Sequence, residues 1–421
     1  MFLALGPVWL GVLHAPVLAA TRVTPPGGQR CATPSNDLLH GVPWTQQRLA
    51  PQRVWDMTTG KGVIVGVVDT GVDASVPQLS GRVLPGVDVV NGSGTANTDC
   101  YGHGTFVAGI IGAAQVSGTG VAGIAPDVKI LPVRQANDLN DGTASSLAKS
   151  IVAAVNGGAK VINVSATSFT PTEELRAAVT YAQGHDVVLV ASASNEAQQG
   201  NPTAYPAAYP GVIAVGAIGH DGRRTGFSEV GKYLDLVAPG VDIVSLSRGG
   251  IGHVLDDGTS YAAPFVAGVA ALVRAYHPKL TAPQVKRRLE LTADHPAAAL
   301  PDPEMGWGVV NPYTAVTAVL PQESGPVAPP AAPPKMSKVA RIVPDTTARD
   351  LAVNVTTIAV ISAAVVGLLA IVAPRGYRRG WRPAGSPAPD SDSDSDLGPN
   401  PRPERPRQAR HHAHPARGGR A

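Results

Sequence analysis

The chain has 421 residues and is 44% hydrophobic, which is enough to bury the core of one large domain or two ordinary ones. Its formal net charge is only +3, and the Lys and Arg residues of its central region do not gather into a stripe, which argues against a nucleic-acid-binding protein. We therefore expect a globular protein with appendages at its ends and no nucleic-acid partner.

The N-terminal segment is typical of an exported protein. Residues 1–20 contain no Lys or Arg, are apolar through Leu18 and end in small residues, which predicts a secretory signal peptide. Signal peptides usually begin with a basic residue and this segment does not, so an uncleaved anchor is the alternative. Residues 21–41 are rich in Pro, Gly and Thr and predict an extended arm.

Residues 42–320 alternate short β-branched runs with helical patterns. Near-continuous apolar runs are typical of strands buried on both faces of a parallel sheet, and their alternation with helices predicts a doubly wound α/β fold. The expected strands are 62–69, 128–134, 159–165, 186–192 and 211–218. The expected helices are 104–114, 144–158 and 171–185. The last should begin after Thr172, with acidic residues in its first turn, and should have Gly184 as its C-cap.

A second hydrophobic segment follows this region. Residues 321–350 predict an extended Pro-rich linker. Residues 351–374 carry no charge, and a helix of about 24 residues reaches roughly 36 Å, enough for a hydrocarbon core of about 30 Å. Arg375 and the arginines after it indicate a cytoplasmic end by the positive-inside rule, and residues 375–421 are typical of a disordered tail. The sequence thus predicts a single-pass cell-membrane protein whose folded domain is extracellular.

The chain has two cysteines, Cys31 in the arm and Cys100 in the folded region. Outside the cell an oxidising environment would allow them to pair, and two free thiols are the alternative. The loop of about 70 residues between them would contribute about 4 kcal/mol in the chain-entropy model. A bridge would hold the arm beside His103, which lies three residues after Cys100.

Four polar residues stand at places where an α/β sheet carries chemistry, the carboxyl ends of strands and the starts of helices. Asp69 ends a strand in "VIVGVVDTGVD" and Asn195 ends another in "VVLVASASNEA". His103 lies between glycines in "YGHGTFVAGIIG", and Ser260 stands before a small-residue helix in "DDGTSYAAPFVAG". Taken singly each has another reading: a capping Asp, half of an aspartic-protease pair, an incidental loop His, or a Ser N-cap with Pro264 in the first turn.

Together, and in this order, the four segments resemble the subtilisin-type serine proteases, and the resemblance covers residues 42–320. It implies a three-layer α/β fold with a mostly parallel sheet. It also implies that Ser260 is the nucleophile, His103 the general base and then acid, and Asp69 the carboxylate that orients the imidazole. Asn195 would donate to the oxyanion. No catalytic cofactor or metal is implied; structural calcium is common in the family, but no Asp-rich loop lets us assign its ligands.

Two departures from the family pattern lie in the segments expected to bind substrate. The chain has Ser165, Ala166 and Thr167 in "SATS", where the family usually has "SLGG", and Ser194 where it usually has glycine. Both changes add side-chain bulk. We therefore expect a narrow pocket that prefers a small residue such as Ala before the cleaved bond.

The order of segments along the whole chain resembles the mycosins, membrane-anchored proteases associated with type VII secretion in actinobacteria. The resemblance implies an endopeptidase that acts on exported proteins, with a type VII secretion membrane complex as its partner. The alternative is a largely structural component that stabilises the secretion complex, with catalysis dispensable.

Overall fold

The computed structural model describes residues 31–139, 141–324, 354–363 and 366 of the chain. The expected signal peptide, most of the linker and the C-terminal tail lie outside these ranges and stay predictions. The chain divides at Pro334 into two units, and the first unit carries the α/β fold.

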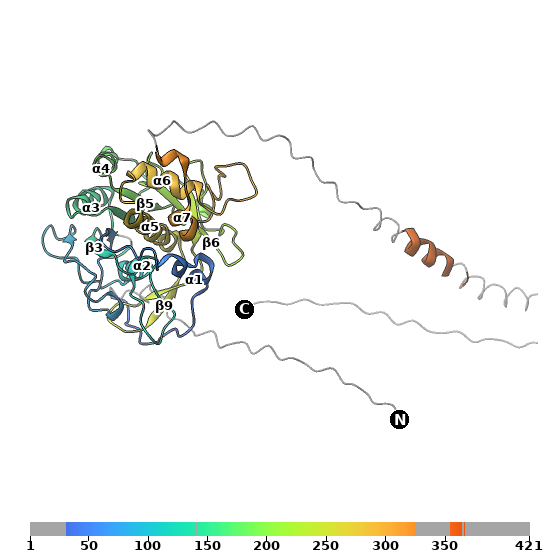
Figure 1. The fold of residues 1–421 in the computed structure, drawn as a ribbon, viewed down its shortest axis with the longest axis horizontal. Helices are drawn as coiled ribbons and strands as arrows, with labels where there is room; N and C mark the ends of the chain where they lie inside the picture. The colour runs from blue at the N-terminus through green and yellow to red at the C-terminus, as the bar shows by residue number, and fades with distance from the viewer. Residues whose placement is uncertain (1–30, 140, 325–353, 364–365, 367–421) are drawn as a thin grey trace, which may run out of the picture. The chain divides into compact units, whose positions relative to one another are not determined.

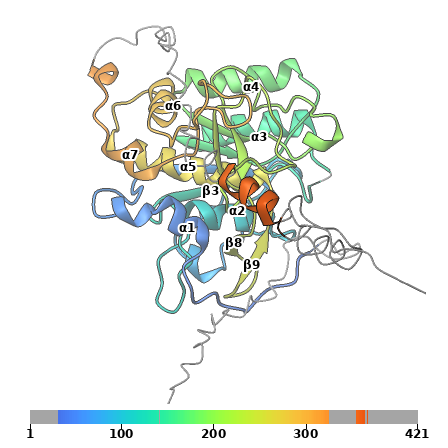
Figure 2. The same ribbon diagram turned by 90° about the vertical axis from the view of Figure 1, so that its right-hand side faces the viewer.

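A seven-stranded sheet forms the centre of the first unit (Figures 1 and 2), with the strand order β2-β3-β1-β4-β5-β6-β7 and every neighbouring pair parallel. Its strands are β1 (Ile64–Asp69), β2 (Val87–Asp88), β3 (Lys129–Arg134), β4 (Val161–Val164), β5 (Val188–Ser192), β6 (Ile213–Ile218) and β7 (Leu236–Pro239). All five expected strands are therefore confirmed. Because β1 lies between β3 and β4, the chain reverses its direction across the sheet beside β1, where ligands bind in open α/β sheets.

Helices cover both faces of the sheet, which confirms the expected α/β fold with a mostly parallel sheet. One face carries α2 (His103–Gly112), α5 (Thr259–Tyr276) and α6 (Ala282–Leu291). The other carries α3 (Ala144–Asn156) and α4 (Glu173–Gly184), which lie side by side. The remaining elements are α1 (Trp44–Leu49), α7 (Pro312–Thr317), the antiparallel hairpin β8 (Ile243–Leu246) and β9 (His253–Asp256), and the 3-10 turns η1 (Pro51–Val54), η2 (Pro77–Leu79), η3 (Ala197–Gln199) and η4 (Pro321–Ser324).

The period of two along each strand divides the apolar side chains between two cores. In β1, Val65 and Val67 join the core under α2 and α5, whereas Val68 joins the core under α3 and α4. Helix α5 is buried over most of its length, and its small residues let it approach its neighbours closely. At Gly268, an added Cβ would lie 2.6 Å from Ile124 Cβ, so a larger side chain there would force the two apart.

The start of α4 is confirmed, but its end differs from the expectation. The Thr172 hydroxyl accepts a hydrogen bond from the Leu175 amide at 3.2 Å and caps the helix. Gly184 is the last helical residue and His185 is the C-cap. The chain turns one residue later, at Asp186, which adopts the left-handed conformation with φ 56° and accepts a hydrogen bond from Arg274 at 3.0 Å. The buried arginine therefore holds the turn that follows the helix.

In the second unit, residues 354–363 and 366 are helical. Across the described ranges, no helix has both the length and the apolar content that a membrane crossing requires. The expected span, 351–374, extends beyond the described residues at both ends, so the membrane anchor and its orientation stay predictions.

Candidate active site

The carboxylate of Asp69 and the imidazole of His103 meet at the carboxyl end of β1. Asp69 is the last residue of β1 and His103 is the first residue of α2. The distance from His103 Nδ1 to Asp69 Oδ1 is 2.7 Å, and the two residues are 1% and 3% exposed. With Nδ1 engaged by the carboxylate, Nε2 is the ring nitrogen left to exchange a proton.

A glycine directly after His103 lets the start of α2 lie against the loop that follows β1. A Cβ on Gly104 would stand 2.0 Å from the carbonyl oxygen of Gly71, a distance that no side chain tolerates. The Gly104 amide also donates to Thr70 Oγ1 at 3.1 Å. The glycine therefore brings the imidazole and the carboxylate within hydrogen-bonding distance.

A second buried carboxylate, Asp99, fixes the same two segments to each other. It accepts hydrogen bonds from Thr70 Oγ1 at 3.0 Å, from the Gly102 amide at 2.8 Å, and from the amide and hydroxyl of Thr105 at 2.8 and 2.7 Å. It lies at the N-terminus of α2, where the helix dipole favours a negative charge. Burial nevertheless raises the pKa of Asp99 above its ordinary value. Sequence reasoning missed this residue, although an acid just before a helix start is a usual capping signal.

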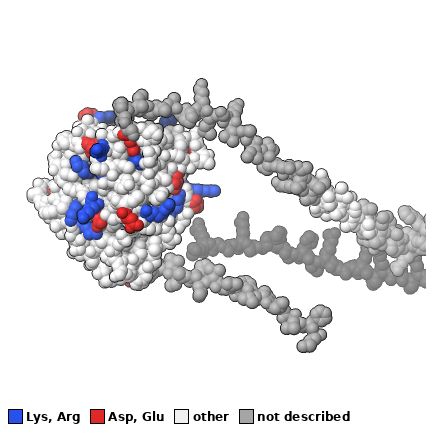
Figure 3. Space-filling model, viewed as in Figure 1, with Lys and Arg blue, Asp and Glu red and all other residues white. Residues whose placement is uncertain are grey.

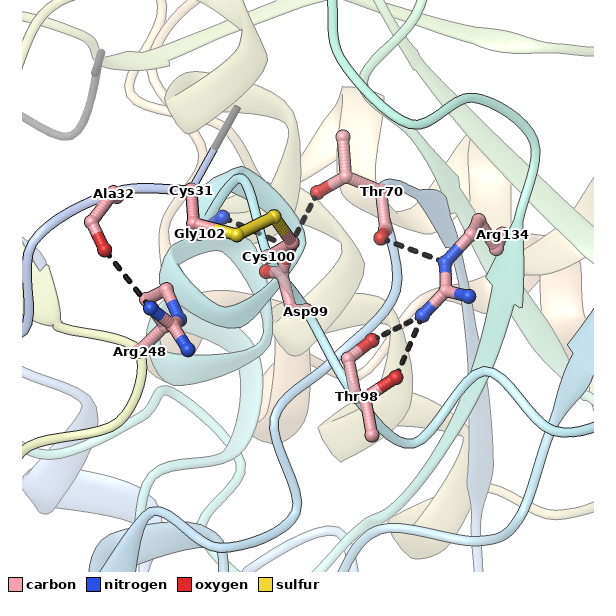
Figure 4. Close-up of a disulfide and its surroundings, with 9 residues drawn as sticks. All are labelled: Cys31, Ala32, Thr70, Thr98, Asp99, Cys100, Gly102, Arg134 and Arg248. Carbon is pink, nitrogen blue, oxygen red and sulfur yellow. Dashed lines mark hydrogen bonds between the residues drawn. A yellow bond between two sulfur atoms is a disulfide. The ribbon is translucent and has the colours of Figure 1, made fainter. Parts of the chain in front are cut away.

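The expected disulfide is confirmed: Cys31 is bonded to Cys100, with their Cα atoms 4.4 Å apart. Figure 4 shows the bond next to Asp99. The Ala32 amide donates to the Cys100 carbonyl at 2.9 Å, and Arg248 donates to the Ala32 carbonyl at 2.9 Å. The arm is thus held beside the helix that carries the imidazole.

Ser260 is the second residue of α5, and Gly258 is the N-cap of that helix, so the reading of Ser260 as an N-cap is wrong. Pro264 lies inside the helix instead of in its first turn. Because proline has no N–H, the carbonyl of Ser260, four residues earlier, has no helical partner. The Ser165 hydroxyl donates to that carbonyl at 2.7 Å, so a side chain from the end of β4 takes the place of the missing helical bond.

The ring of Tyr261, the residue after Ser260, packs on the imidazole. Tyr261 follows Ser260 directly, and the centroid of its ring lies 5.1 Å from that of His103. Among the described residues, no hydrogen bond joins the Ser260 hydroxyl to His103. In unliganded sites of this kind the hydroxyl–imidazole contact is often long and tightens when substrate binds.

Asn195 lies beyond the end of β5 with its amide group oriented by α5. Its Oδ1 accepts hydrogen bonds from the amide and the hydroxyl of Thr259, both at 2.9 Å. Because the oxygen is occupied by these donors, the NH₂ group faces away from them. Asn195 is exposed, so its N–H groups are available to an oxygen atom next to Ser260.

A cavity of about 320 Å³ adjoins Ser260 and Asn195. The four expected substrate-binding residues all line it, but they differ in what they present. Ser165 uses its hydroxyl on α5, whereas Ser194 is buried with φ 81°, a conformation that favours glycine. The full lining is Gln135, Leu139, Gly142, Thr143, Ala144, Leu147, Ser165, Ala166, Thr167, Ser168, Phe169, Ser192, Ser194, Asn195, Glu196, Thr259 and Ser260.

Two large, exposed apolar side chains that line this cavity were not expected from the sequence. Leu139 is 49% exposed and Phe169 is 48% exposed, and both lie in segments whose Gly, Asp and Thr content indicates loops. Their only sequence signal is a large apolar side chain within a polar loop. A larger polar hollow of about 940 Å³ lies beside the disulfide, but none of the four candidate catalytic residues lines it.

Several charges act on the imidazole. Burial by itself lowers the pKa of His103, but the charge of Asp69 and the hydrogen bond to it act in the opposite direction. Asp99 and Asp256 add to the rise. The pKa of His103 therefore lies above its ordinary value, and the surrounding carboxylates favour the protonated imidazole.

A buried acid lies behind the cavity wall. Glu229 is fully buried, and its amide donates to the Ser194 carbonyl at 3.3 Å. Tyr233 donates its hydroxyl to Glu229 Oε2 at 3.1 Å. Burial raises the pKa of Glu229 to about 6, against the lowering effect of Tyr233 and of the Ser194 hydroxyl. No sequence signal pointed to Glu229, because the Ser194 segment that packs on it lies far from it in the chain.

The described residues hold no group of three or more His, Cys, Asp or Glu side chains that could bind a metal ion. On the face drawn in Figure 3, Lys and Arg lie among Asp and Glu instead of forming one continuous patch. The absence of a nucleic-acid partner stays a prediction.

Comparison with known proteins agrees with this geometry. The family model described as "Subtilase family" matches residues 60–308. The thermophilic serine proteinase of Bacillus sp. (strain AK1) is 39% identical over 68% of this chain and 69% of its own length. Mycosin-1 of Mycolicibacterium smegmatis is 35% identical over 75% of this chain and 84% of its own length. A solved structure, "MycP1 from the ESX-1 type VII secretion system", has a TM-score of 0.63 and 32% identity over 73% of this chain and 96% of that one. The chain therefore belongs to the subtilase family of serine proteases.

Proposed function

We propose that the protein is a mycosin-like serine endopeptidase in which Asp69, His103 and Ser260 form the catalytic triad and Asn195 is an oxyanion donor. The observation that carries the proposal is the buried 2.7 Å hydrogen bond between Asp69 and His103, on whose imidazole Tyr261, the residue after Ser260, packs. A carboxylate, an imidazole and a hydroxyl in this relation are the minimum set for acyl transfer by serine.

In the first step, Ser260 Oγ attacks the carbonyl carbon of the scissile peptide bond and gives its proton to His103 Nε2. The electron pair of the carbonyl moves to its oxygen, which receives hydrogen bonds from Asn195 Nδ2 and from the Ser260 amide. That amide has no intrahelical partner because it belongs to the first turn of α5. Asp69 stabilises the imidazolium that forms.

In the second step, the tetrahedral intermediate collapses and the C–N bond breaks. His103 gives its proton to the leaving amine, and the acyl group stays on Ser260. Water then attacks the ester with His103 as base, and the second collapse releases the acid and restores the serine hydroxyl.

We place this activity outside the cell at a type VII secretion membrane complex, with exported proteins as substrates. The similarity to mycosin-1 and to MycP1, a protein of the ESX-1 type VII secretion system, supports this placement. The disulfide supports it too, because structural disulfides persist in oxidising compartments. In this proposal residues 351–374 anchor the protein and residues 375–421 face the cytoplasm.

The bulk around the cavity bears on the substrate. Ser194 replaces the glycine usual in the family, and Thr167 lines the same cavity. We propose that these side chains narrow the pocket and favour a small residue, such as Ala, before the cleaved bond. Leu139 and Phe169 offer apolar surface at the same cavity to residues further from that bond.

The test replaces the nucleophile in the full-length protein. Cells that lack the gene receive the wild type, Ser260→Ala or the control Ser80→Ala, which changes an exposed serine. Mass spectrometry of their exported proteins compares the termini. New termini that require Ser260 but not Ser80 support the endopeptidase. Cleavage that persists in purified Ser260→Ala protein contradicts it, and restored secretion without cleavage favours the structural role instead.

A further inference from the structure

The side of His103 that faces α5 is covered by an aromatic ring. Tyr261 is 3% exposed, and its ring lies at 42° to the imidazole with centroids 5.1 Å apart. Phe106 packs on the same tyrosine with centroids 4.5 Å apart. The tyrosine is thus fixed from behind, and the imidazole cannot turn toward α5 without displacing it.

The hydroxyl of this tyrosine donates a hydrogen bond to a third buried carboxylate, that of Asp256. Tyr261 donates to Asp256 Oδ2 at 2.8 Å, and the Asp257 amide donates to Asp256 Oδ1 at 2.9 Å. Asp256, the last residue of β9, is 7% exposed. None of the ion pairs between described residues includes Asp256. A buried carboxylate without a cation is costly, unless a positive charge forms close to it.

The only group near the pair that gains a positive charge in the proposed reaction is His103. We propose that Tyr261 and Asp256 are positioning residues for that step: the ring of Tyr261 holds the imidazole, and Asp256 supports the imidazolium through the tyrosine hydroxyl. The inference rests on the proposed function. A phenol that donates to a carboxylate has a more electron-rich ring, and an aromatic ring close to a cation attracts it.

The other groups that face the imidazole come from different elements. Asp69 lies at the end of β1 and Asp99 before α2, and both act on His103 together with Asp256 from β9. The pKa of Tyr101 is raised mainly by burial, and the charge of Asp256 contributes a smaller part of that rise. Among the carboxylates that raise the pKa of His103, Asp69 has the largest effect and Asp256 adds to it. Loss of the Asp256 charge should therefore reduce the rise in the pKa of His103 without removing it.

The test measures kcat and KM for a peptide substrate against pH, with the purified full-length protein. Removing the charge in Asp256→Asn lowers the pKa of His103, so the acidic limb of kcat/KM should move to lower pH by ~0.3 to 1 unit. On the plateau His103 is neutral before the attack and gains its proton only during the attack, so kcat there should fall about 3- to 30-fold while KM stays close to its wild-type value. Tyr261→Phe keeps the ring and removes the hydroxyl, and should lower kcat in the same way.

The control is Asp127→Asn, which removes the same charge from an exposed acid paired with Arg82. Covalent labelling of Ser260 by a fluorophosphonate counts the folded sites in each variant. The inference is overturned if folded Asp256→Asn and Tyr261→Phe keep the wild-type kcat, or if the acidic limb of Asp256→Asn moves no further than that of Asp127→Asn. If Ser260→Ala is inactive in the same experiment, that result rejects only the positioning role of Tyr261 and Asp256, and the proposed function still holds.

Discussion

Replacing Glu229 by glutamine should stabilise the protein at neutral pH and leave it nearly unchanged in acid. In the folded protein, burial raises the pKa of Glu229 from 4.5 to about 6. The folded state therefore holds this proton more tightly than the unfolded state. Stability falls as the pH rises from about 4.5 to about 6, and the full loss is present above that window.

The size of the effect follows from the same pKa. A rise from 4.5 to about 6 corresponds to about 2 kcal/mol at about 1.36 kcal/mol per unit. Glutamine keeps the shape of the side chain and an oxygen that accepts from Tyr233, so the gain comes from the lost charge.

The assay is urea unfolding at pH 4.5 and pH 7.5 of Ser260→Ala protein with and without Glu229→Gln, since the inactive background prevents autolysis during unfolding. Glu304→Gln, at an exposed acid, is the matched control. Glu229→Gln should raise the unfolding free energy at pH 7.5, and most of the gain should be gone at pH 4.5. An equal gain at both pH values, or a loss at pH 7.5, would refute the reasoning.

Two further changes probe the proposed oxyanion donor, Asn195, and the arm. Asn195→Ala removes the side-chain donor and should lower kcat about 10²- to 10³-fold, the range known for this donor in subtilisin itself, with little change in KM; a loss confined to KM would assign Asn195 to substrate binding. Replacing Cys31 and Cys100 together by serine opens a loop of 69 residues and should cost about 4 kcal/mol in the chain-entropy model. Thermal unfolding with intact and replaced cysteines measures that loss, and an unchanged midpoint would show that the remaining arm contacts suffice.

The central strands could be predicted from the sequence because short β-branched runs between turn residues rarely form anything other than strands. Asp69, His103 and Asn195 were visible because each ends a strand or begins a helix. Glu229 and Asp256 were not visible, because only the folded chain brings Ser194 against Glu229 and His103 against Tyr261, the partner of Asp256. In the sequence neither residue differs from an ordinary surface acid. Only their burial in the folded protein sets them apart from surface acids.

The reading of Ser260 as an N-cap shows how the tertiary structure overrides a helix signal. Pro264 was expected in the first turn, where a missing N–H has no cost, but it lies further in. There it leaves the Ser260 carbonyl without a helical bond, and Ser165 satisfies that carbonyl from β4. Ser260 is consequently tied to the sheet through its own backbone as well as through the helix. A motion of α5 relative to β4 would break this bond, so the proline couples the position of Ser260 to the strand whose extension lines the substrate cavity.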